Sequence, residues 1–277
     1  MLSIIISSYQ IDYFEQFKRN VEVTIGCNFV YEIVSVQNNN EYSINEAYNK
    51  GGKKAKYNNL LFIHEDVIFR TNDWGDKLVA LLKKENIGCI GVAGEDYESY
   101  FPSYWFSNPN KKCHFIQDSK DGEILMEKVN FKNDVLDPIV SLDGVFIACT
   151  RKVFEEFLFD ENIKGYHGYD YDFSVRVASV YQNYITSEIL IKHFSTGGLS
   201  KEWLQSLLFV RKKNGFLSSY KLINKELELS KAYSLILLLK KYNYTTKQIF
   251  LIVANYLSIP KIGLLNCLKI INRLRYT

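Results

Sequence analysis

The stretch Leu60-Leu61-Phe62-Ile63-His64-Glu65-Asp66-Val67 decides how this chain is interpreted. Its four consecutive apolar residues are typical of a strand buried on both faces of a sheet. The His-Glu-Asp that follows would then stand at the carboxyl end of the strand, where open α/β sheets bind their ligands. Acids at a strand end are also common as helix caps or solvated loop charges, so the stretch takes its meaning from the rest of the chain.

The composition is that of a folded protein with a substantial core. Of 277 residues, 47% are hydrophobic and 15% aromatic, enough for one large domain or for one with a smaller appendage. The five cysteines include no Cys-x-x-Cys pair, which argues against a zinc or redox centre and for reduced thiols in the cytoplasm. The N-terminal apolar run lacks a basic leader and predicts a buried strand. No apolar run reaches the roughly 20 residues of a membrane-spanning helix.

Charge is distributed unevenly along the chain. Residues 201–277 hold 14 Lys and Arg against 3 Asp and Glu, a net charge of +11. Residues 1–200 hold the remaining 20 basic and 28 acidic residues, a net charge of −8. We therefore expect two parts with different roles, 1–200 and 201–277.

Residues 1–200 alternate between short apolar runs and amphipathic stretches, which predicts an α/β fold with a mostly parallel sheet and helices on both faces. Strands are predicted at 2–7, 32–37, 60–63, 87–93, 141–150 and 189–193, and helices at 12–21, 44–54, 74–84, 152–157 and 170–181. Asn72 or Asp73 can cap the third helix, where apolar residues recur at i, i+4, i+7 and i+8 from Trp74. The polar stretch 95–138 predicts a hairpin or a long excursion over the sheet edge.

The basic part 201–277 predicts three or four helices, with Ser230 and Thr245 as N-caps and Pro260 as an interruption. Such helices could rest on the anionic inner face of a membrane, or pack on the first part or on a second subunit. Packing is favoured, because polar and apolar residues do not separate cleanly around the helices. No nucleic-acid-binding module accompanies the charge, which argues against nucleic acid as a partner.

Three segments that are distant in the sequence carry side chains suited to one site. Asp66, with coordination positions left for phosphates and water, would satisfy Mg²⁺ or Mn²⁺, and His64 could face the same side. A predicted helix begins with Asp170 and Asp172, where a carboxylate can be functional or a simple cap. Another predicted strand ends at His193, a position at which a lone histidine is more often structural.

These three segments and several others follow one another in an order and at a spacing that occur in a known protein family. The segments are Ser7-Ser8-Tyr9, Glu32-Ile33-Val34-Ser35-Val36-Gln37-Asn38-Asn39, Asn45 with Gly51-Gly52 and Ala55, Phe62-Ile63-His64-Glu65-Asp66-Val67, Leu142-Asp143-Gly144-Val145-Phe146, Tyr169-Asp170-Tyr171-Asp172 with Arg176, and His193. In this arrangement residues 1–200 resemble GT-A-fold glycosyltransferases related to glycosyltransferase family 2, in the bacterial branch whose Asp-x-Asp motif reads His-x-Asp.

The resemblance implies a Rossmann-like GT-A fold, a nucleotide-diphosphate-sugar donor and roles for single residues. Asp66 would hold a divalent metal, Mn²⁺ or Mg²⁺, that bridges the donor's diphosphate, with His64 and His193 as further ligands. Asp170 would be the general base, with Asp172 as the alternative.

The resemblance also implies a donor-binding set. Its members are Ser7, Tyr9, Gln37, Asn45, Glu65 and Asp143. Ser7, Tyr9 and Gln37 would line the nucleoside pocket, and Asp143 would touch the donor sugar or the acceptor. Two positions depart from the family pattern, because Gln37 replaces the usual aspartate and Tyr169 replaces the usual glutamate.

The predicted chemistry needs few groups. Attack of a hydroxyl on an anomeric carbon requires a base near the incoming oxygen and a cation near the departing diphosphate. A single base implies one displacement, with inversion. Taken with the resemblance, this chemistry predicts a metal-dependent inverting hexosyl- or N-acetylhexosaminyltransferase. The resemblance further implies a saccharide or lipid-linked acceptor in surface polysaccharide or glycolipid synthesis.

Two alternatives stay open. A nucleotidyltransferase would normally carry a Gly-rich basic loop after its first strand, where this chain has Ser7-Ser8-Tyr9-Gln10. A catalytically degenerate module of the same fold would bind a glycan or a membrane without turnover.

Overall fold

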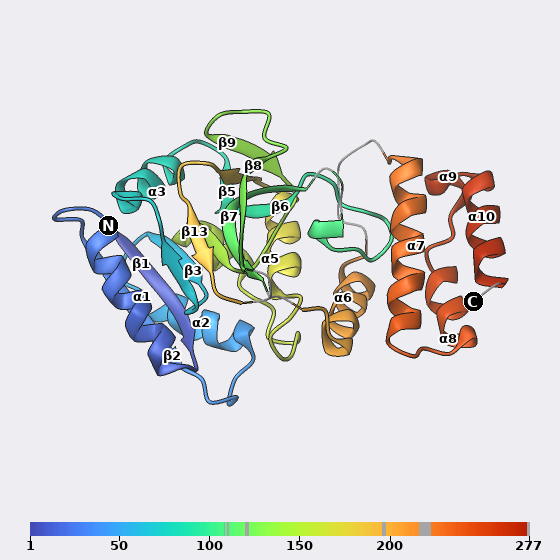
Figure 1. Cartoon of the computed structure of the whole chain (residues 1–277), viewed down its shortest axis with the longest axis horizontal. Coiled ribbons are helices and arrows are strands. Elements are labelled where there is room, and N and C mark those ends of the chain that lie inside the picture. Colours follow the sequence, from blue (N-terminus) through green and yellow to red (C-terminus); the bar gives the residue numbers. More distant parts are fainter. Residues whose placement is uncertain (108, 110, 120–121, 196–197, 216–222, 276–277) are drawn as a thin grey trace.

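A seven-stranded sheet lies at the centre of the first part in the computed structural model, which describes residues 1–107, 109, 111–119, 122–195, 198–215 and 223–275 (Figure 1). Its strands in spatial order are β2 (Tyr31–Gln37), β1 (Leu2–Ser8), β3 (Asn59–Ile63), β11 (Phe146–Thr150), β5 (Ile87–Gly91), β12 (Gln182–Thr186) and β9 (Leu136–Ile139). β1 is parallel to β2 and β3, and β12 is parallel to β5, but β11 runs antiparallel between β3 and β5. β9 also runs antiparallel to its neighbour β12. The predicted mostly parallel sheet is therefore mixed, because β11 and β9 enter it in the reverse direction.

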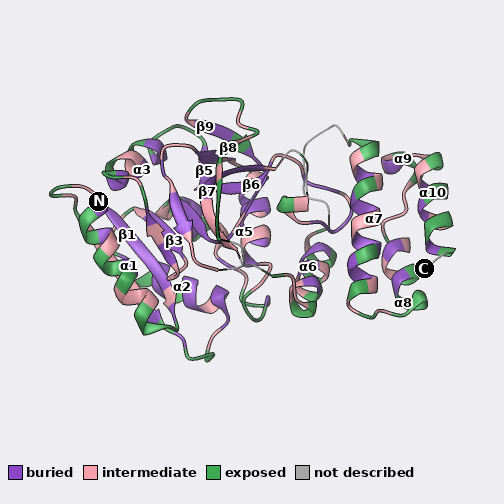
Figure 2. Ribbon diagram, viewed as in Figure 1, coloured by how far each residue is buried: buried purple, intermediate pink, exposed green. Residues whose placement is uncertain are grey.

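Helices cover both faces of this sheet, as predicted. They are α1 (Ile11–Thr24), α2 (Ile44–Lys54), α3 (Trp74–Leu82), α4 (Arg151–Phe157) and α5 (Tyr169–Ala178). Alternation along β3 shows how the two faces are filled: Leu61 and Ile63 belong to the core cluster under α1 and α3, whereas Leu60 and Phe62 belong to the cluster under α2, α4 and α5. Buried residues accordingly follow the strands, and exposed residues follow the outer sides of the helices (Figure 2).

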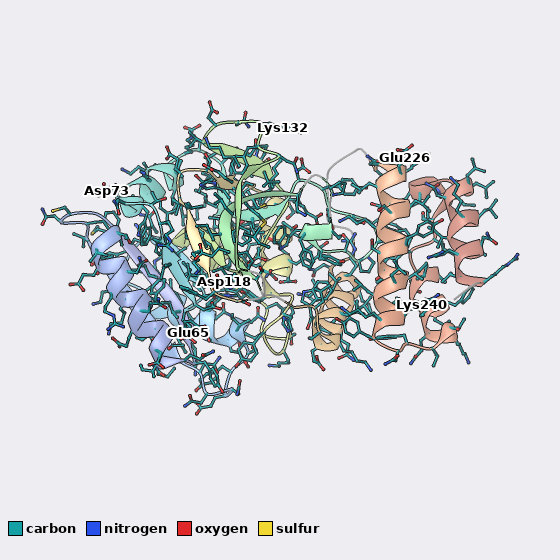
Figure 3. The ribbon with its side chains drawn as sticks, in the orientation of Figure 1. Glu65, Asp73, Asp118, Lys132, Glu226 and Lys240 are labelled. Carbon is teal, nitrogen blue, oxygen red and sulfur yellow. The ribbon has the colours of Figure 1, made fainter. Side chains whose placement is uncertain are left out.

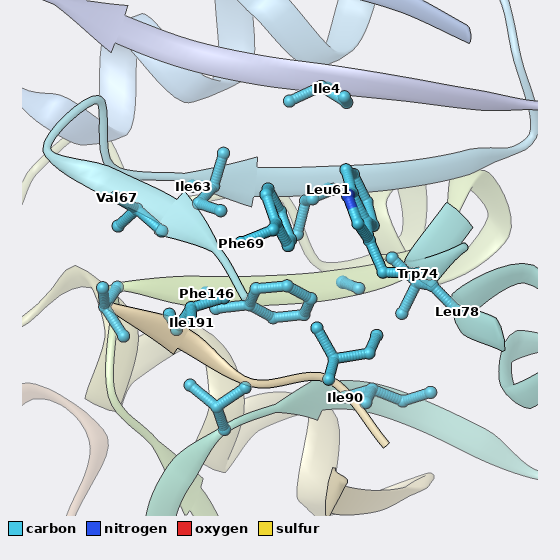
Figure 4. Close-up of a cluster of buried hydrophobic side chains, with 14 of the residues drawn as sticks. Ile4, Leu61, Ile63, Val67, Phe69, Trp74, Leu78, Ile90, Phe146 and Ile191 are labelled. Atoms are coloured by element: carbon cyan, nitrogen blue, oxygen red, sulfur yellow. The ribbon is translucent and has the colours of Figure 1, made fainter. Parts of the chain in front are cut away.

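Aromatic stacking joins α3 to β4 (Val67–Phe69), a strand of a second sheet. The Trp74 ring lies flat on Phe69, with centroids 3.7 Å apart (Figure 4), and its Nε1 donates to Thr24 Oγ1 at 3.1 Å. Asp73 occupies the N-cap position of α3, as one of the two predicted alternatives, but its left-handed backbone leaves the side chain without a capping hydrogen bond.

A second sheet of six strands in the described residues packs beside the first. It contains β10 (Ser141–Leu142), β6 (Ala93–Glu95), β7 (Lys112–Ser119), β13 (Ile191–His193) and β4 (Val67–Phe69) in this order, with β8 (Gly122–Val129) paired to β7. β7 and β8 form the hairpin expected in 95–138, and the short 3₁₀ helix η1 (Trp105–Ser107) precedes them.

Some predicted boundaries were wrong. The single strand expected at 141–150 is divided between the two sheets as β10 and β11, with Asp143, Gly144 and Val145 between them. The helix expected to reach Tyr181 ends at Ala178, and β12 follows it. The short strands β4, β9 and β12 were not predicted, because three to five residues give too little periodicity to detect.

Within the described part of 201–277 the chain forms five helices instead of the predicted three or four. They are α6 (Lys201–Asn214), α7 (Lys225–Lys241), α8 (Thr246–Ala254), α9 (Ile259–Ile262) and α10 (Leu264–Arg275). Thr245 caps α8 as predicted, but Ser230 lies inside α7, whose cap is Asn224, and Pro260 begins α9. Among the described helices none has both the length and the apolar character needed to cross a membrane.

The Glu228 carboxylate of α7 fastens the C-terminal helices to the segment after β6. It accepts hydrogen bonds from Tyr97 Oη (2.5 Å), Ser99 Oγ (3.1 Å), Tyr100 N (2.8 Å) and Phe101 N (3.2 Å). Its side chain is fully buried, and a buried carboxylate is tolerated only when such donors replace water. One side chain therefore holds two backbone amides and two hydroxyls.

Replacing Glu228 by Ala should lower the free energy of unfolding by about 3 kcal/mol, because two buried backbone amides lose their acceptor. Glu226→Ala is the matched control, since Glu226 is an exposed glutamate on the same helix, and it should change stability by less than about 0.5 kcal/mol. Urea unfolding measures both variants. Equal losses in the two would contradict the role assigned to Glu228.

Candidate active site

Three potential metal ligands meet where β3 and β13 end. His64 directly follows β3, Asp66 lies between β3 and β4, and His193 is the last residue of β13. Pairing of β13 with β4 sets His193 opposite Val67, and Phe194 N donates to Asp66 O at 2.9 Å. Asp66 Oδ2 lies 3.5 Å from His193 Nε2, and Asp66 Oδ1 lies 3.8 Å from His64 Nδ1. The structure thus brings together the three residues predicted as metal ligands.

The electrostatics of this cluster suit a cation. Burial lowers the pKa of His64, and the neighbouring His193 lowers it further. Burial alone would raise the pKa of Asp66, but His193 and His64 outweigh it and hold that pKa below its ordinary value. A neutral imidazole and an ionised carboxylate are the forms in which both groups bind metals.

The donor atoms of the cluster also fit a divalent cation. One ligand atom from each of His64, Asp66 and His193 lies within 4.8 Å of the others. His193 Nε2 is buried and makes no hydrogen bond to any described residue, so no described group competes with a metal for it. A mixed nitrogen and oxygen set favours Mn²⁺ over Mg²⁺, which prefers oxygen ligands alone.

A cavity of about 560 Å³ opens beside the cluster. Its polar lining includes His64, His193, Asp143 and Asp170. Its aromatic lining comprises Trp105, Phe106, Phe115, Tyr166, Tyr169 and Trp203. Aromatic faces beside a few converging polar groups are typical of sites that bind organic ligands.

Asp170 combines exposure to this cavity with an unusual pKa. It stands in the first turn of α5, and its Oδ2 accepts from Gly144 N at 3.0 Å. Burial, followed by the charge of Asp143, raises the pKa of Asp170 to about 7. Asp143 itself accepts from Trp105 Nε1 (2.8 Å) and Val145 N (2.9 Å). A carboxylate whose pKa lies near neutrality is well matched to general base chemistry.

Tyr169, which precedes Asp170, connects the start of α5 to the cluster of potential metal ligands. Its hydroxyl lies 2.8 Å from His64 Nε2. At Gly144, a Cβ atom would come within 2.0 Å of this hydroxyl, so only glycine lets the ring take this position. The tyrosine that departs from the family pattern is therefore built into the surroundings of His64.

A second cavity of about 290 Å³ adjoins the first at His64 and Tyr166, which line both. Ser7 and Tyr9, two of the three residues predicted to line a nucleoside pocket, line this cavity together with Glu65 and Asp66. The structure does not bring Gln37 to this cavity: Gln37 is exposed at the end of β2.

Asn38, the next residue, lines the cavity instead. It is buried, and its Nδ2 donates to Ser7 Oγ at 3.0 Å. Asn38 lines the cavity and Gln37 does not, because consecutive side chains of an extended chain point to opposite faces.

Glu65 and Asn45 hold the chain rather than leaving free groups for a ligand. Glu65 Oε1 accepts from Gln10 N at 2.7 Å and Glu65 Oε2 accepts from Ser8 Oγ at 2.9 Å, so its carboxylate holds the segment that joins β1 to α1. The Glu65 side chain is labelled in Figure 3. Asn45 is fully buried in α2, where Nδ2 donates to Ile163 O at 2.8 Å, and it lines neither cavity.

The prediction of Asp172 as an alternative base is not supported by its surroundings. Asp172 is fully buried, pairs with Arg176 at 2.7 Å and Lys213 at 2.8 Å, and accepts from Asn214 Nδ2 at 2.8 Å. It lines neither of the two cavities. Two cations and an amide occupy its acceptor positions, so it joins α5 to α6.

The sequence reasoning missed several residues of the site, among them Trp105, Gln117, Asn38 and Trp203. Trp105 and Gln117 lie in the stretch 95–138, which has little hydrophobic periodicity to place them. Trp203 lies on α6, beyond the boundary expected at 200. Only Asn38 carried a usable signal, because it is the first polar residue after a strand.

Comparisons with known proteins bear on the family and the fold. A sequence model described as a glycosyltransferase-like family matches residues 3–194. A sequence comparison with curated proteins gives no significant match. Among solved structures, GalNAc-T7 with UDP, GalNAc and Mn²⁺ is 12% identical with a TM-score of 0.53, over 99% of this chain and 54% of that one. Staphylococcus aureus TarS is 10% identical with a TM-score of 0.52, over 87% of this chain and 44% of that one.

These likenesses establish the fold, a mixed α/β fold of the GT-A type. The chain spans about half the length of the two structures.

Proposed function

Because the chain belongs to the glycosyltransferase-like family, we propose that it transfers a sugar from a nucleotide-diphosphate donor to an acceptor hydroxyl, with inversion at the anomeric carbon. One observation carries this proposal: Asp170 and two of the three potential metal ligands line one cavity, which adjoins the cavity at Ser7 and Tyr9. The smaller cavity would hold the nucleoside. The larger would hold the donor sugar and a saccharide acceptor, between aromatic walls that suit sugar rings.

In this mechanism Asp170 accepts the proton of the attacking hydroxyl. Gly144 N–H orients its carboxylate, and burial beside Asp143 raises the pKa so that the proton is retained after transfer. His64, Asp66 and His193 would hold a divalent cation, which would supply positive charge to the departing nucleoside diphosphate. With a single base, the acceptor hydroxyl displaces the nucleoside diphosphate in one step, which inverts the anomeric carbon.

The role of Asp66 can be tested by ligand-dependent thermal unfolding with UDP, GDP or CDP, each with and without Mn²⁺. A nucleotide at about a hundred times its dissociation constant should stabilise the wild type by about 2.7 kcal/mol. In Asp66→Asn the Mn²⁺-dependent part of this stabilisation should vanish, because the central ligand has lost its charge. Asp73→Asn, an exposed aspartate outside both cavities, should behave as wild type.

Nucleotide stabilisation that does not require Mn²⁺, or that survives in Asp66→Asn, would remove the proposed metal role. Stabilisation by a glycan but by none of the three nucleotides would favour the non-catalytic module. Release of pyrophosphate from a nucleoside triphosphate and a sugar phosphate would instead favour a nucleotidyltransferase.

Replacing Asp170 by Asn should lower kcat by a factor on the order of 100 to 10,000 while leaving donor affinity nearly unchanged, because a general base acts only in the chemical step. In the wild type, kcat should rise as the pH increases through about 7 and then level off, since Asp170 must be ionised to accept a proton. Asp172→Asn serves as the comparison and should reduce stability more than turnover. Loss of turnover in folded Asp172→Asn alone would show that the base is misassigned.

We also propose that α10 contacts an anionic membrane surface. It buries Cys267, Ile270 and Leu274 against the other helices and exposes Leu264, Leu265 and Leu268 by 55%, 72% and 53%. Residues 229–277 contain eight Lys and Arg and no acidic residue. Exposed leucines in a segment whose charged residues are all basic favour binding to a surface that is both apolar and negatively charged.

Co-sedimentation with lipid vesicles tests this contact. Wild type should bind phosphatidylglycerol-containing vesicles more strongly than pure phosphatidylcholine vesicles, and Leu265→Glu/Leu268→Glu should abolish the difference. The control Ile11→Glu/Val23→Glu makes the same change at two exposed positions of α1 and should retain binding. Absence of wild-type binding would refute the contact. A dimer that only the α10 variant disrupts would assign the face to a second copy.

A further inference from the structure

We propose that Gln117 is a positioning residue that fixes the proton of His193 on Nδ1 and so presents a bare Nε2 to a divalent cation. This inference deepens the metal role in the proposed function and rests on it. Gln117 lies in β7 and is not among the site residues predicted from the sequence.

Strand pairing places the two side chains together. β7 and β13 are parallel neighbours, and Gln117 is the register partner of His193. Residues in register on adjacent strands project to the same face of a sheet. The Gln117 side chain therefore reaches His193 from the side opposite Asp66, and Gln117 Oε1 lies 3.2 Å from His193 Nδ1.

The orientation of the Gln117 amide follows from its other contacts. Its Nε2 donates to the backbone carbonyl of Ser195 and also lies 3.4 Å from Asp118 O. Carbonyl oxygens only accept hydrogen bonds, so the NH₂ group must face them and Oε1 must face His193. Because Oε1 also only accepts, His193 Nδ1 must carry the proton that joins them.

The second nitrogen of His193 is then available to a metal. His193 Nε2 is buried, makes no hydrogen bond to the described residues, and faces Asp66 Oδ2 at 3.5 Å. A bare nitrogen and a carboxylate oxygen are both acceptors and repel each other unless a cation lies between them. Outer partners of this kind orient metal-binding histidines and set their tautomer.

Metal affinity tests the proposal in the full chain. Gln117→Met keeps the length of the side chain but removes the acceptor, so Mn²⁺ binding measured by titration calorimetry should weaken by a factor on the order of 10 to 100. Gln182→Met is the matched control, because Gln182 is also a strand glutamine that donates to backbone carbonyls, at Ile139 and Asn183. Gln117→Glu, which restores an oxygen acceptor, should recover most of the lost affinity.

Nitrogen-15 NMR of the four histidines gives a second readout that does not depend on activity. With Mg²⁺ bound at pH 8, His193 should show a protonated Nδ1 and an unprotonated Nε2 in the wild type, and should lose this fixed tautomer in Gln117→Met. A proton on Nε2 of the wild type would overturn the proposal, as would equal Mn²⁺ affinity in folded Gln117→Met. A wild type that binds neither cation would overturn the metal role in the proposed function as well.

Discussion

The pairing of β13 with β4 and β7 is the interaction on which the site depends. It unites residues from three regions of the chain: the segment after β3, the hairpin strand β7 and the end of β13. Phe194 N donates to Asp66 O, so the backbone itself fixes the distance between the aspartate and His193. None of these strands is long enough to be stable alone. The apolar core beneath them, with Phe69, Val67 and Ile191 buried together, holds them in register.

Much of this arrangement could be predicted because it follows from local patterns. The run of apolar residues before His64 identified a buried strand, and the strand ends placed His64, Asp66 and His193 at one edge of the sheet. The helix start at Asp170 was visible for the same reason. These features depend on residues within a few positions of one another, which is the range over which periodicity and capping operate.

The remainder depends on contacts that a single sequence does not reveal. Asp172 resembles Asp170 in its local context, but Lys213 and Asn214 come from α6, some 40 positions away, and occupy its oxygens. Gln37 and Asn38 differ only in the face of the strand to which they point. β11 looks like its neighbours in composition, and only its pairing with β3 and β5 shows that its direction is reversed. Gln117 has no local pattern at all, because only its register with His193 gives it a role.

The structure shows that part of the positive charge of residues 201–277 is buried in ion pairs with the first part. Two of its basic residues form buried ion pairs. Arg211 pairs with Glu98 at 2.6 Å and Lys231 pairs with Glu95 at 3.3 Å, and all four side chains are buried. These pairs join the acidic first part to the basic second part. Part of the difference in net charge between the two parts therefore reflects ion pairs that connect them. Among the described residues, α10 keeps three exposed basic side chains, Lys269, Arg273 and Arg275.

The bonds that Glu228 makes to Tyr100 and Phe101 have a consequence for how such proteins can diversify. The segment they secure continues to Trp105 and Phe106, which line the larger cavity, and α6 adds Trp203 to the same wall. A helical extension that is exchanged for another by recombination would therefore reshape this wall, while β3 and β13 would keep the cluster around Asp66. Under the proposed function, such an exchange would alter the part of the site that meets the acceptor and leave the metal ligands in place.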